Sequence, residues 1–497
     1  MSALGGLIVV LAAWLGGRAL LPSRTALPRC GWEEQGIAYL LGSATLVLAA
    51  MAATWAGLPF SAVTAGALLA LSAFAGGWRL LRDRREPLAD RALKGWPFPL
   101  VVALGLGSVA LTLAWPLNEF DPILHFAFKG RLLFGGADPA GEAFTAIAGD
   151  YGRVMTHPNY PLGVPFLEAF AAHAGGGWSD RWVQAPLALW SACLPAAVSL
   201  GLRGLSPAAA RAGALIAACT PALYAREFLS GGLADLGAAG LGEEKMLGGR
   251  GDLPLMALFG AGAALLLIAR RCGARTRAGL PAWRPAALAG LCLAGGAMMK
   301  NEGLALIGVV AIALALGALL EGGRNWRPGA VALGVAALAL TPWLVHRGAL
   351  PAIDENYSEQ VSLERIGHYL TVDESDENSP IRAENYGEDW TGASRWRPAR
   401  IGRYFGSEFL DLLSWGLLWP LAALGLLHAL RRRELRWLAL VLAGGVALYA
   451  LILLVTPWFL PSLYKKGIPA RLLIHLAGPA ALLAGAVFGP RKTAAAG

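Results

Sequence analysis

Residues 285–320 read PAALAGLCLAGGAMMKNEGLALIGVVAIALALGALL, two apolar segments joined by the short polar turn Lys300-Asn301-Glu302. As helices, these segments approach the length that crosses a hydrocarbon layer about 30 Å thick. Ionised groups at the centre of a membrane are costly, so the turn must lie at a surface or in a wet cavity. The stretch predicts two membrane helices with a functional charged turn between them. A purely structural ion pair between Lys300 and Glu302 is the alternative.

The apolar pattern extends over the rest of the chain. Of 497 residues, 56% are hydrophobic and only 15% are charged, and the mean hydropathy is +0.52. A typical soluble domain has about 25% charged residues, so a single soluble domain is excluded. We expect an all-α polytopic membrane protein with about thirteen transmembrane helices. The expected spans are 4–22, 37–57, 59–77, 98–116, 181–202, 208–225, 252–269, 285–299, 303–320, 328–346, 406–426, 437–456 and 471–489.

Basic residues gather in three short loops, within 79–94, 270–284 and 431–436. The positive-inside rule predicts that these loops are cytoplasmic, and the number of intervening spans keeps all three on one side. The net charge of +9 therefore sets orientation and does not indicate nucleic acid as a partner. We expect a multi-pass protein of the cell inner (plasma) membrane whose working face is extracytoplasmic, or periplasmic.

Four regions follow from this arrangement. The expected divisions are N-terminal helices over 1–96, a transmembrane core over 97–346 with a first outer loop at 117–180, an acidic outer loop over 347–404, and C-terminal helices over 405–497. Because the N-terminus lacks a basic n-region, we expect residues 1–21 to be a retained first span rather than a cleaved signal.

The first outer loop opens with two carboxylates, Glu119 and Asp121, directly after a span. If residues 121–134 form an α-helix, Asp121, His125 and Lys129 share one face at i, i+4 and i+8. This spacing predicts an interfacial helix whose polar stripe faces a bound molecule. An anchoring helix that Asp121 merely caps, ahead of Pro122, is the alternative.

Two further segments on the outer side carry polar groups at helix mouths. In the loop that ends with His157-Pro158-Asn159-Tyr160-Pro161, the prolines predict a rigid re-entry. His157 is a metal ligand, an acceptor-binding group or an ordinary interfacial histidine, and Tyr160 is a candidate substrate contact. Asp252 precedes Leu253-Pro254 and is either a helix cap or a binding residue.

Near the C-terminus, Lys465 and Arg471 lie on the expected outer side of the last span. The positive-inside rule predicts few basic residues there, so these two indicate an anionic partner. Because arginine forms bidentate bonds to phosphate, a lipid-linked phosphate at the helix mouth is the partner we expect.

An acidic run occupies the long outer loop: Asp373, Glu374, Asp376 and Glu377, followed by Glu384, Glu388 and Asp389. Such a run is usually a solvated surface. The alternative is a site for a divalent cation, because clustered carboxylates supply the oxygen ligands of a hard cation. No cofactor is otherwise expected, and metal dependence stays open.

From about Trp96 to about Pro490 the chain resembles the GT-C class of polytopic membrane glycosyltransferases, which includes protein O-mannosyltransferases and lipid A aminoarabinose transferases. The resemblance consists of the first-loop acidic residues, the His157 re-entry, Asp252-Leu-Pro, Lys300-Asn-Glu-Gly, and Arg471 ahead of the last span. It implies a GT-C-like bundle, a polyprenyl-phosphate sugar donor, and Asp121 as catalytic base with Glu119 as the alternative. The adjacent Asp-Glu pair of the mannosyltransferase branch is interrupted here by Phe120.

We therefore expect an inverting glycosyltransferase of the cell envelope. It would transfer a sugar to a glycan, lipid or protein acceptor with inversion of the configuration at the sugar C1. Asp121 would be the general base, and Arg471 with Lys129 or Lys300 would bind the departing phosphate. The substrate-binding candidates are His125, His157, Tyr160, Asp252, Asn301 and Glu302. Two alternatives remain: a transporter or flippase, because charged groups between apolar spans also line translocation paths, and a ligase or polymerase of lipid-linked glycans.

Overall fold

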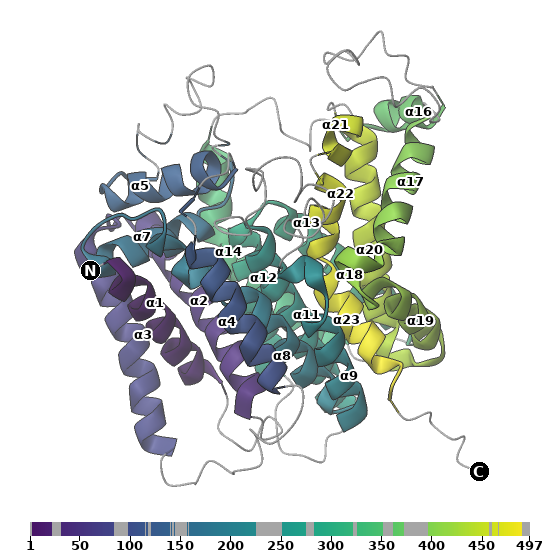
Figure 1. The fold of residues 1–497 in the computed structure, drawn as a ribbon, viewed down its shortest axis with the longest axis horizontal. Helices are drawn as coiled ribbons and strands as arrows, with labels where there is room; N and C mark the ends of the chain where they lie inside the picture. The colour runs from purple at the N-terminus through teal and green to yellow at the C-terminus, as the bar shows by residue number, and fades with distance from the viewer. Residues whose placement is uncertain are drawn as a thin grey trace.

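The computed structural model describes residues 2–21, 31–83, 98–114, 116–117, 121–139, 141, 144, 157, 159–224, 251–274, 283–321, 326–350, 361–371, 396–456, 460–465 and 467–489. Helices account for 85% of the structure, and no strand occurs within these ranges. The prediction of an all-α protein is confirmed (Figure 1).

The α-helices are α1 (Ser2–Leu20), α2 (Gly31–Trp55), α3 (Ala62–Asp83), α4 (Phe98–Ala114), α5 (Phe128–Phe134), α7 (Gly163–Gly175), α8 (Trp190–Arg203), α9 (Pro207–Ala218), α11 (Asp252–Ala274), α12 (Trp283–Met299), α13 (Glu302–Leu320), α14 (Trp326–Ala349), α16 (Leu363–Thr371), α17 (Arg397–Leu410), α18 (Leu412–Trp415), α19 (Leu418–Arg431), α20 (Arg433–Val455), α21 (Leu460–Lys465), α22 (Ile468–Ile474) and α23 (Ala477–Ala486). A π-helix, η1, covers Asp121–Ala127, and the 3-10 helices η2 and η3 cover Trp182–Leu187 and Pro221–Leu223.

Within the described ranges, eight helices are long and apolar enough to cross a membrane. They are Ala3–Leu20, Gly31–Trp55, Ala62–Arg82, Trp182–Arg203, Asp252–Arg271, Glu302–Leu320, Trp326–Ala349 and Arg433–Val455. The pair α22 and α23, bent by 58°, would make a ninth span. The chain is therefore a polytopic membrane protein by the length and composition of its helices.

The thirteen expected spans are not confirmed. Helices α4, α9 and α19 are apolar but shorter than the eight candidates. The expected span 406–426 is wrong, because α17 ends at Leu410 and α19 begins at Leu418. The Asp411 carboxylate accepts the backbone N–H groups of Leu413 and Ser414 and so begins the short α18, and Gly416 then takes a positive φ of 54°.

Large apolar side chains on the outer helices face away from the protein. Val63 and Phe74 on α3 are 81% and 69% exposed, and Leu319 on α13 and Leu338 on α14 are also exposed. A continuous apolar surface of this kind is unfavourable in water. It is the surface expected of helices that contact lipid.

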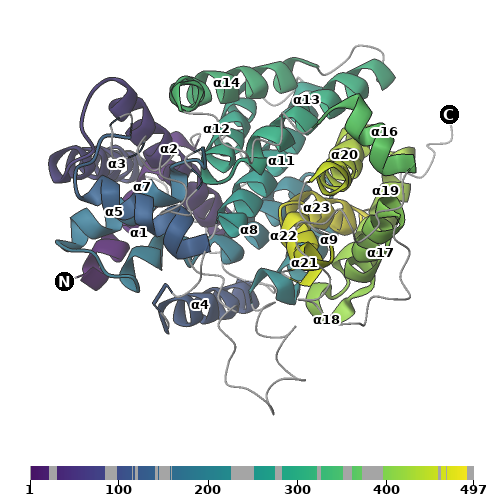
Figure 2. The same ribbon diagram turned by 90° about the horizontal axis from the view of Figure 1, so that it is seen from above.

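Helix α11 lies at the centre of the bundle and packs against α8, α12 and α23 (Figure 2). Helices α1, α2 and α3 pack together on one side, and α17 and α19 to α23 lie on the other (Figure 2). Small residues allow the close packing of α1 and α2: a Cβ on Gly42 would collide with the Ala13 carbonyl oxygen. The last helices and the central helix thus meet although they are far apart in sequence.

The bundle has two chemically different ends. At one end, which we call the Arg270 end, Arg270 pairs with Glu321 at 2.9 Å and Arg271 lies 3.7 Å from Glu434. Asp252 begins α11 and Arg270 comes 18 residues later, about 27 Å away along the helix axis. We call the opposite end, where Lys300 and the first outer loop also lie, the Asp252 end (Figure 1).

Candidate functional site

The candidate site is built by three chain segments that meet at the Asp252 end: the start of α11, the α12–α13 turn and α22. The turn fits closely against the start of α11, because a Cβ on Gly251 would lie 2.5 Å from the Met299 carbonyl oxygen. Pro254 falls in the first turn of α11, where no helical N–H is needed. These local features fix Asp252 beside Lys300.

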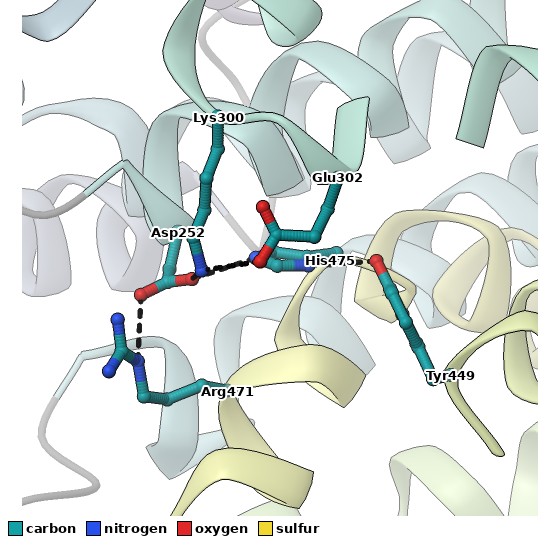
Figure 3. Close-up of polar contacts among 6 residues, drawn as sticks. All are labelled: Asp252, Lys300, Glu302, Tyr449, Arg471 and His475. Atoms are coloured by element: carbon teal, nitrogen blue, oxygen red, sulfur yellow. Dashed lines mark hydrogen bonds and ion pairs between the residues drawn. The ribbon is translucent and has the colours of Figure 1, made fainter. Parts of the chain in front are cut away.

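The Asp252 carboxylate is the centre of the site (Figure 3). Its Oδ1 accepts a bond of 2.6 Å from the Lys300 ammonium and lies 2.8 Å from His475 Nε2. Its Oδ2 accepts a bond of 3.1 Å from Arg471 Nε. Asp252 is only 4% exposed, so this carboxylate is held almost entirely by protein donors.

Behind the carboxylate lies a second layer that the sequence interpretation missed. His475 follows Arg471 by four residues, and its Nδ1 lies 2.8 Å from the Tyr449 hydroxyl on α20. Both His475 and Tyr449 are completely buried. A histidine within an apolar segment is a functional candidate by default, so His475 could have been found from sequence. Tyr449 gave no such signal, since it lies within an ordinary apolar helix.

Glu302 and Asn301 complete the α12–α13 turn. Glu302 Oε1 lies 3.0 Å from the Lys300 ammonium, and its side chain is 21% exposed. Asn301 Oδ1 is buried and has no hydrogen-bond partner among the residues that the structure describes. A buried amide oxygen of this kind requires an explanation, and a bound hydroxyl or water would satisfy it.

The charges in the site compensate each other. Two carboxylates, Asp252 and Glu302, face two cations, Lys300 and Arg471 (Figure 3). Burial disfavours the Lys300 ammonium, but Asp252 and Glu302 outweigh this effect and keep the pKa of Lys300 above its usual value. Removing one partner from such a buried set leaves a charge uncompensated, at a cost of about 3–5 kcal/mol.

A second polar cluster lies in the first outer loop. The Lys129 ammonium donates to the carbonyl oxygens of His157 and, at 3.2 Å, Tyr160. The rings of His125, His157 and Tyr160 form one group, with the His157 centroid 4.2 Å from His125 and 4.6 Å from Tyr160. Lys129 is completely buried and faces no carboxylate within its described contacts, so burial lowers its pKa to about 7.

The two clusters are neighbours. Gly163 follows the Tyr160 segment and begins α7, and a Cβ at Gly163 would collide with the Met298 carbonyl oxygen. Met298 lies two residues before Lys300. The sequence interpretation expected the outer loop and the Lys300 turn to share one end of the bundle, and this contact brings them together.

The polar stripe expected in the outer loop faces the protein instead of the surface. Residues Asp121–Ala127 form a π-helix rather than the expected α-helix, and His125 and Lys129 both turn toward the segment that carries His157 and Tyr160. His125 is 5% exposed and Lys129 is fully buried, whereas the apolar Ile123 is 41% exposed. Because the buried ammonium needs acceptors, Lys129 turns toward the carbonyls of His157 and Tyr160 instead of the surface.

Glu168 on α7 is a buried carboxyl group that the sequence interpretation did not select. It is fully buried, and neither of its oxygens has a hydrogen-bond partner within the described part of the chain. Burial, with a smaller contribution from the Asp180 charge, raises its pKa well above the ordinary value. Burial therefore favours the neutral form of this carboxyl, which lies beside Gly130.

Several predicted residues are only partly described. The side chain of Asp121 at the start of η1 and the side chain of Lys465 at the end of α21 lie outside the described residues, as does all of Glu119. The acidic run from Asp373 to Asp389 also lies outside them. Within the described ranges, no group of three or more His, Cys, Asp or Glu side chains could hold a metal ion.

The structure therefore joins Asp252, Lys300, Glu302 and Arg471 in one site and adds His475 and Tyr449 to it. It joins His125, Lys129, His157 and Tyr160 in a second cluster beside the first. Comparisons of this chain with protein-family models, curated proteins and solved structures find no match.

Proposed function

We propose that this protein is a membrane glycosyltransferase that moves a sugar from a polyprenyl-phosphate donor to an acceptor on the extracytoplasmic face of the inner membrane. The observation that carries the proposal is the meeting of Lys300 and Arg471 at one buried carboxylate, at the end of the bundle opposite the Arg270 cluster. At this end of the bundle, cations can bind the phosphate of a lipid-linked donor while its isoprenoid tail remains among the apolar helices.

The phosphate subsite would be formed by Arg471 and Lys300, with Lys465 as a further cation. Arg471 donates to Asp252 through Nε, and its side chain is 17% exposed. Its guanidinium has five donors, so it can bind a phosphate while keeping its bond to Asp252. Asp252 would hold Lys300 and Arg471 in position before the lipid binds. This preorganisation lowers the free energy needed to arrange the two cations during transfer.

The acceptor side of the reaction would be formed by the first outer loop. Asp121, or Glu119, would take the proton of the acceptor hydroxyl while the acceptor oxygen forms a bond to the sugar C1. The bond from C1 to the phosphate oxygen breaks, and its electron pair stays on the phosphate between Arg471 and Lys300. Because the acceptor attacks opposite the leaving phosphate, the configuration at C1 inverts.

Hydroxyl groups of the sugar or acceptor would find partners between the two clusters. Asn301 Oδ1 is a buried acceptor, and Glu302 is the most exposed carboxylate of the site. His157 and Tyr160 are half-buried rings beside this turn, and stacked rings suit the apolar face of a sugar.

The proposal includes a GT-C-like bundle of about thirteen spans, with the shorter helices as additional crossings. Glycan, lipid and protein acceptors all remain in the proposal, and a glycan ligase or polymerase would use the same site.

A transporter or flippase is the second candidate, and one observation favours it. The α22–α23 pair is bent by 58°, with Arg471 just before the bend and His475 at it. Broken helices that carry ionisable groups are typical of substrate sites in transporters. The transferase is preferred because the polar groups gather at one end of α11 and not at its middle.

The deciding experiment uses the full chain in lipid nanodiscs with a radiolabelled polyprenyl-phosphate sugar and envelope extract as acceptor. We expect label to pass to the acceptor, and we expect Asp121→Asn to abolish transfer while donor binding persists. Arg471→Ala should abolish donor binding. Movement of intact donor between leaflets without covalent change would contradict the transferase and support the transporter.

A further inference from the structure

Among the residues that the structure describes, the charges of the Asp252 site already balance before an anion binds. Five groups face His475 from the elements packed around it: Asp252 on α11, Lys300 and Glu302 at the α12–α13 turn, Tyr449 on α20, and Arg471 on α22 (Figure 3). With His475 neutral, the two carboxylates balance the two cations. A bound phosphate would therefore leave one negative charge uncompensated among these largely buried groups, which is unfavourable.

The hydrogen-bond chain through His475 accommodates both protonation states. In the neutral state, Nε2–H donates to Asp252, so Nδ1 accepts a bond from the Tyr449 hydroxyl. After protonation, Nδ1–H donates to the Tyr449 oxygen, because a hydroxyl can both donate and accept. Both contacts persist in this exchange, and only the hydrogen of the Tyr449 hydroxyl has to turn away from Nδ1.

We propose that phosphate binding at this site is coupled to the uptake of one proton by His475. The inference rests on the phosphate subsite of the proposed function and adds its regulation by pH. The added proton restores neutrality among Asp252, Glu302, Lys300, Arg471, His475 and the bound anion. Affinity for the phosphate group should therefore increase as the pH falls.

The test is calorimetric titration of the full chain in nanodiscs with methyl farnesyl phosphate. This phosphodiester carries one negative charge between about pH 5.5 and 8.5, unlike a monoester, whose second pKa is about 6. Repeating the titration in buffers of different ionisation enthalpy gives the number of protons taken up. We expect about one proton per bound diester, and an affinity that falls about tenfold per pH unit above neutrality.

Two variants separate the proton acceptor from the charge balance. His475→Gln keeps a donor for Asp252 but cannot titrate, so it should bind weakly at every pH and take up no proton. Glu302→Gln removes one negative charge, so it should bind tightly even at high pH and also take up no proton. His428→Gln on α19 is the matched control, because that histidine lies near the Arg270 end and should leave the proton count unchanged.

Three outcomes would contradict the inference, and they separate it from the proposed function. Diester binding by the unaltered protein without proton uptake overturns the coupling and leaves the transferase intact. Proton uptake that persists in His475→Gln assigns the proton elsewhere and also overturns it. Absence of diester binding overturns both proposals. Titrations with inorganic phosphate and with farnesol distinguish a free anion from a lipid headgroup: equal affinity for inorganic phosphate removes the lipid donor but keeps the coupling.

Discussion

Lys300 and Lys129 are both buried lysines at the same end of the bundle, yet their surroundings differ. Lys300 faces two carboxylates, which keep its pKa above the usual value. Lys129 bonds to two backbone carbonyls, and burial lowers its pKa to about 7. Carbonyl oxygens satisfy the hydrogen bonds of an ammonium but do not supply a full opposite charge. The Lys300 ammonium thus keeps its charge over a wider pH range, whereas the Lys129 ammonium can lose its charge near neutral pH.

The largest expected effect comes from removing the shared counter-charge. Asp252→Ala leaves Lys300 and Arg471 close together without a carboxylate between them, so we expect the free energy of unfolding to fall by about 3–5 kcal/mol. Lys129→Met should cost less, about 1–3 kcal/mol, because it leaves two carbonyls unsatisfied but no charge. Unfolding in detergent micelles, measured for both variants, makes the comparison.

A double variant checks the physical cause of this effect. Asp252→Ala combined with Lys300→Met removes opposite charges together, so the loss should be smaller than the sum of the two single losses by about 0.5–3 kcal/mol. Strictly additive losses would contradict the view that charge compensation stabilises this site.

The next prediction concerns pH and Lys129. Its pKa is about 7 in the folded protein, compared with 10.5 for an ordinary lysine, so between these pH values the unfolded chain binds more protons. Stability should therefore rise with pH in this window, by up to about 1.4 kcal/mol per pH unit. Hydrogen exchange of α5 and α7 at pH 7, 8 and 9 measures this rise, and Lys129→Met should remove it. An unchanged slope in that variant would assign the pH dependence to another group.

The smallest expected effect is at Glu168. Because burial favours the neutral form of this carboxyl, Glu168→Gln replaces it with an uncharged group of similar shape. We expect a change in unfolding free energy within about 0.5 kcal/mol at pH 7. A loss of about 1–3 kcal/mol would instead show that the native carboxyl makes a bond that the amide cannot replace.

Sequence patterns predicted the helical class and most of the candidate site, for different reasons. Apolar length alone identifies spans such as 303–320, but it cannot detect the break at Asp411 and Gly416, which depends on local capping and a positive φ. Charges such as Lys300, Asp252 and Arg471 are conspicuous because a membrane makes them costly. Tyr449 could not be selected, since only tertiary packing brings its hydroxyl to His475.

The polar stripe of the first outer loop shows what residue spacing cannot predict. Spacing placed His125 and Lys129 on one face, but spacing cannot tell whether that face meets solvent or protein. The carbonyls of His157 and Tyr160 orient Lys129 toward the protein. These carbonyls belong to a neighbouring segment of the chain, so the residue pattern within 121–134 cannot predict their position.

The four-residue interval between Arg471 and His475 has a consequence for the last helices. One helical turn is 3.6 residues, so the two side chains project in nearly the same direction and reach opposite oxygens of one carboxylate. An insertion of a single residue between them would rotate one partner by about 100° relative to the other. The surrounding loops can therefore vary in length, but the number of residues between Arg471 and His475 must stay constant for both side chains to reach Asp252.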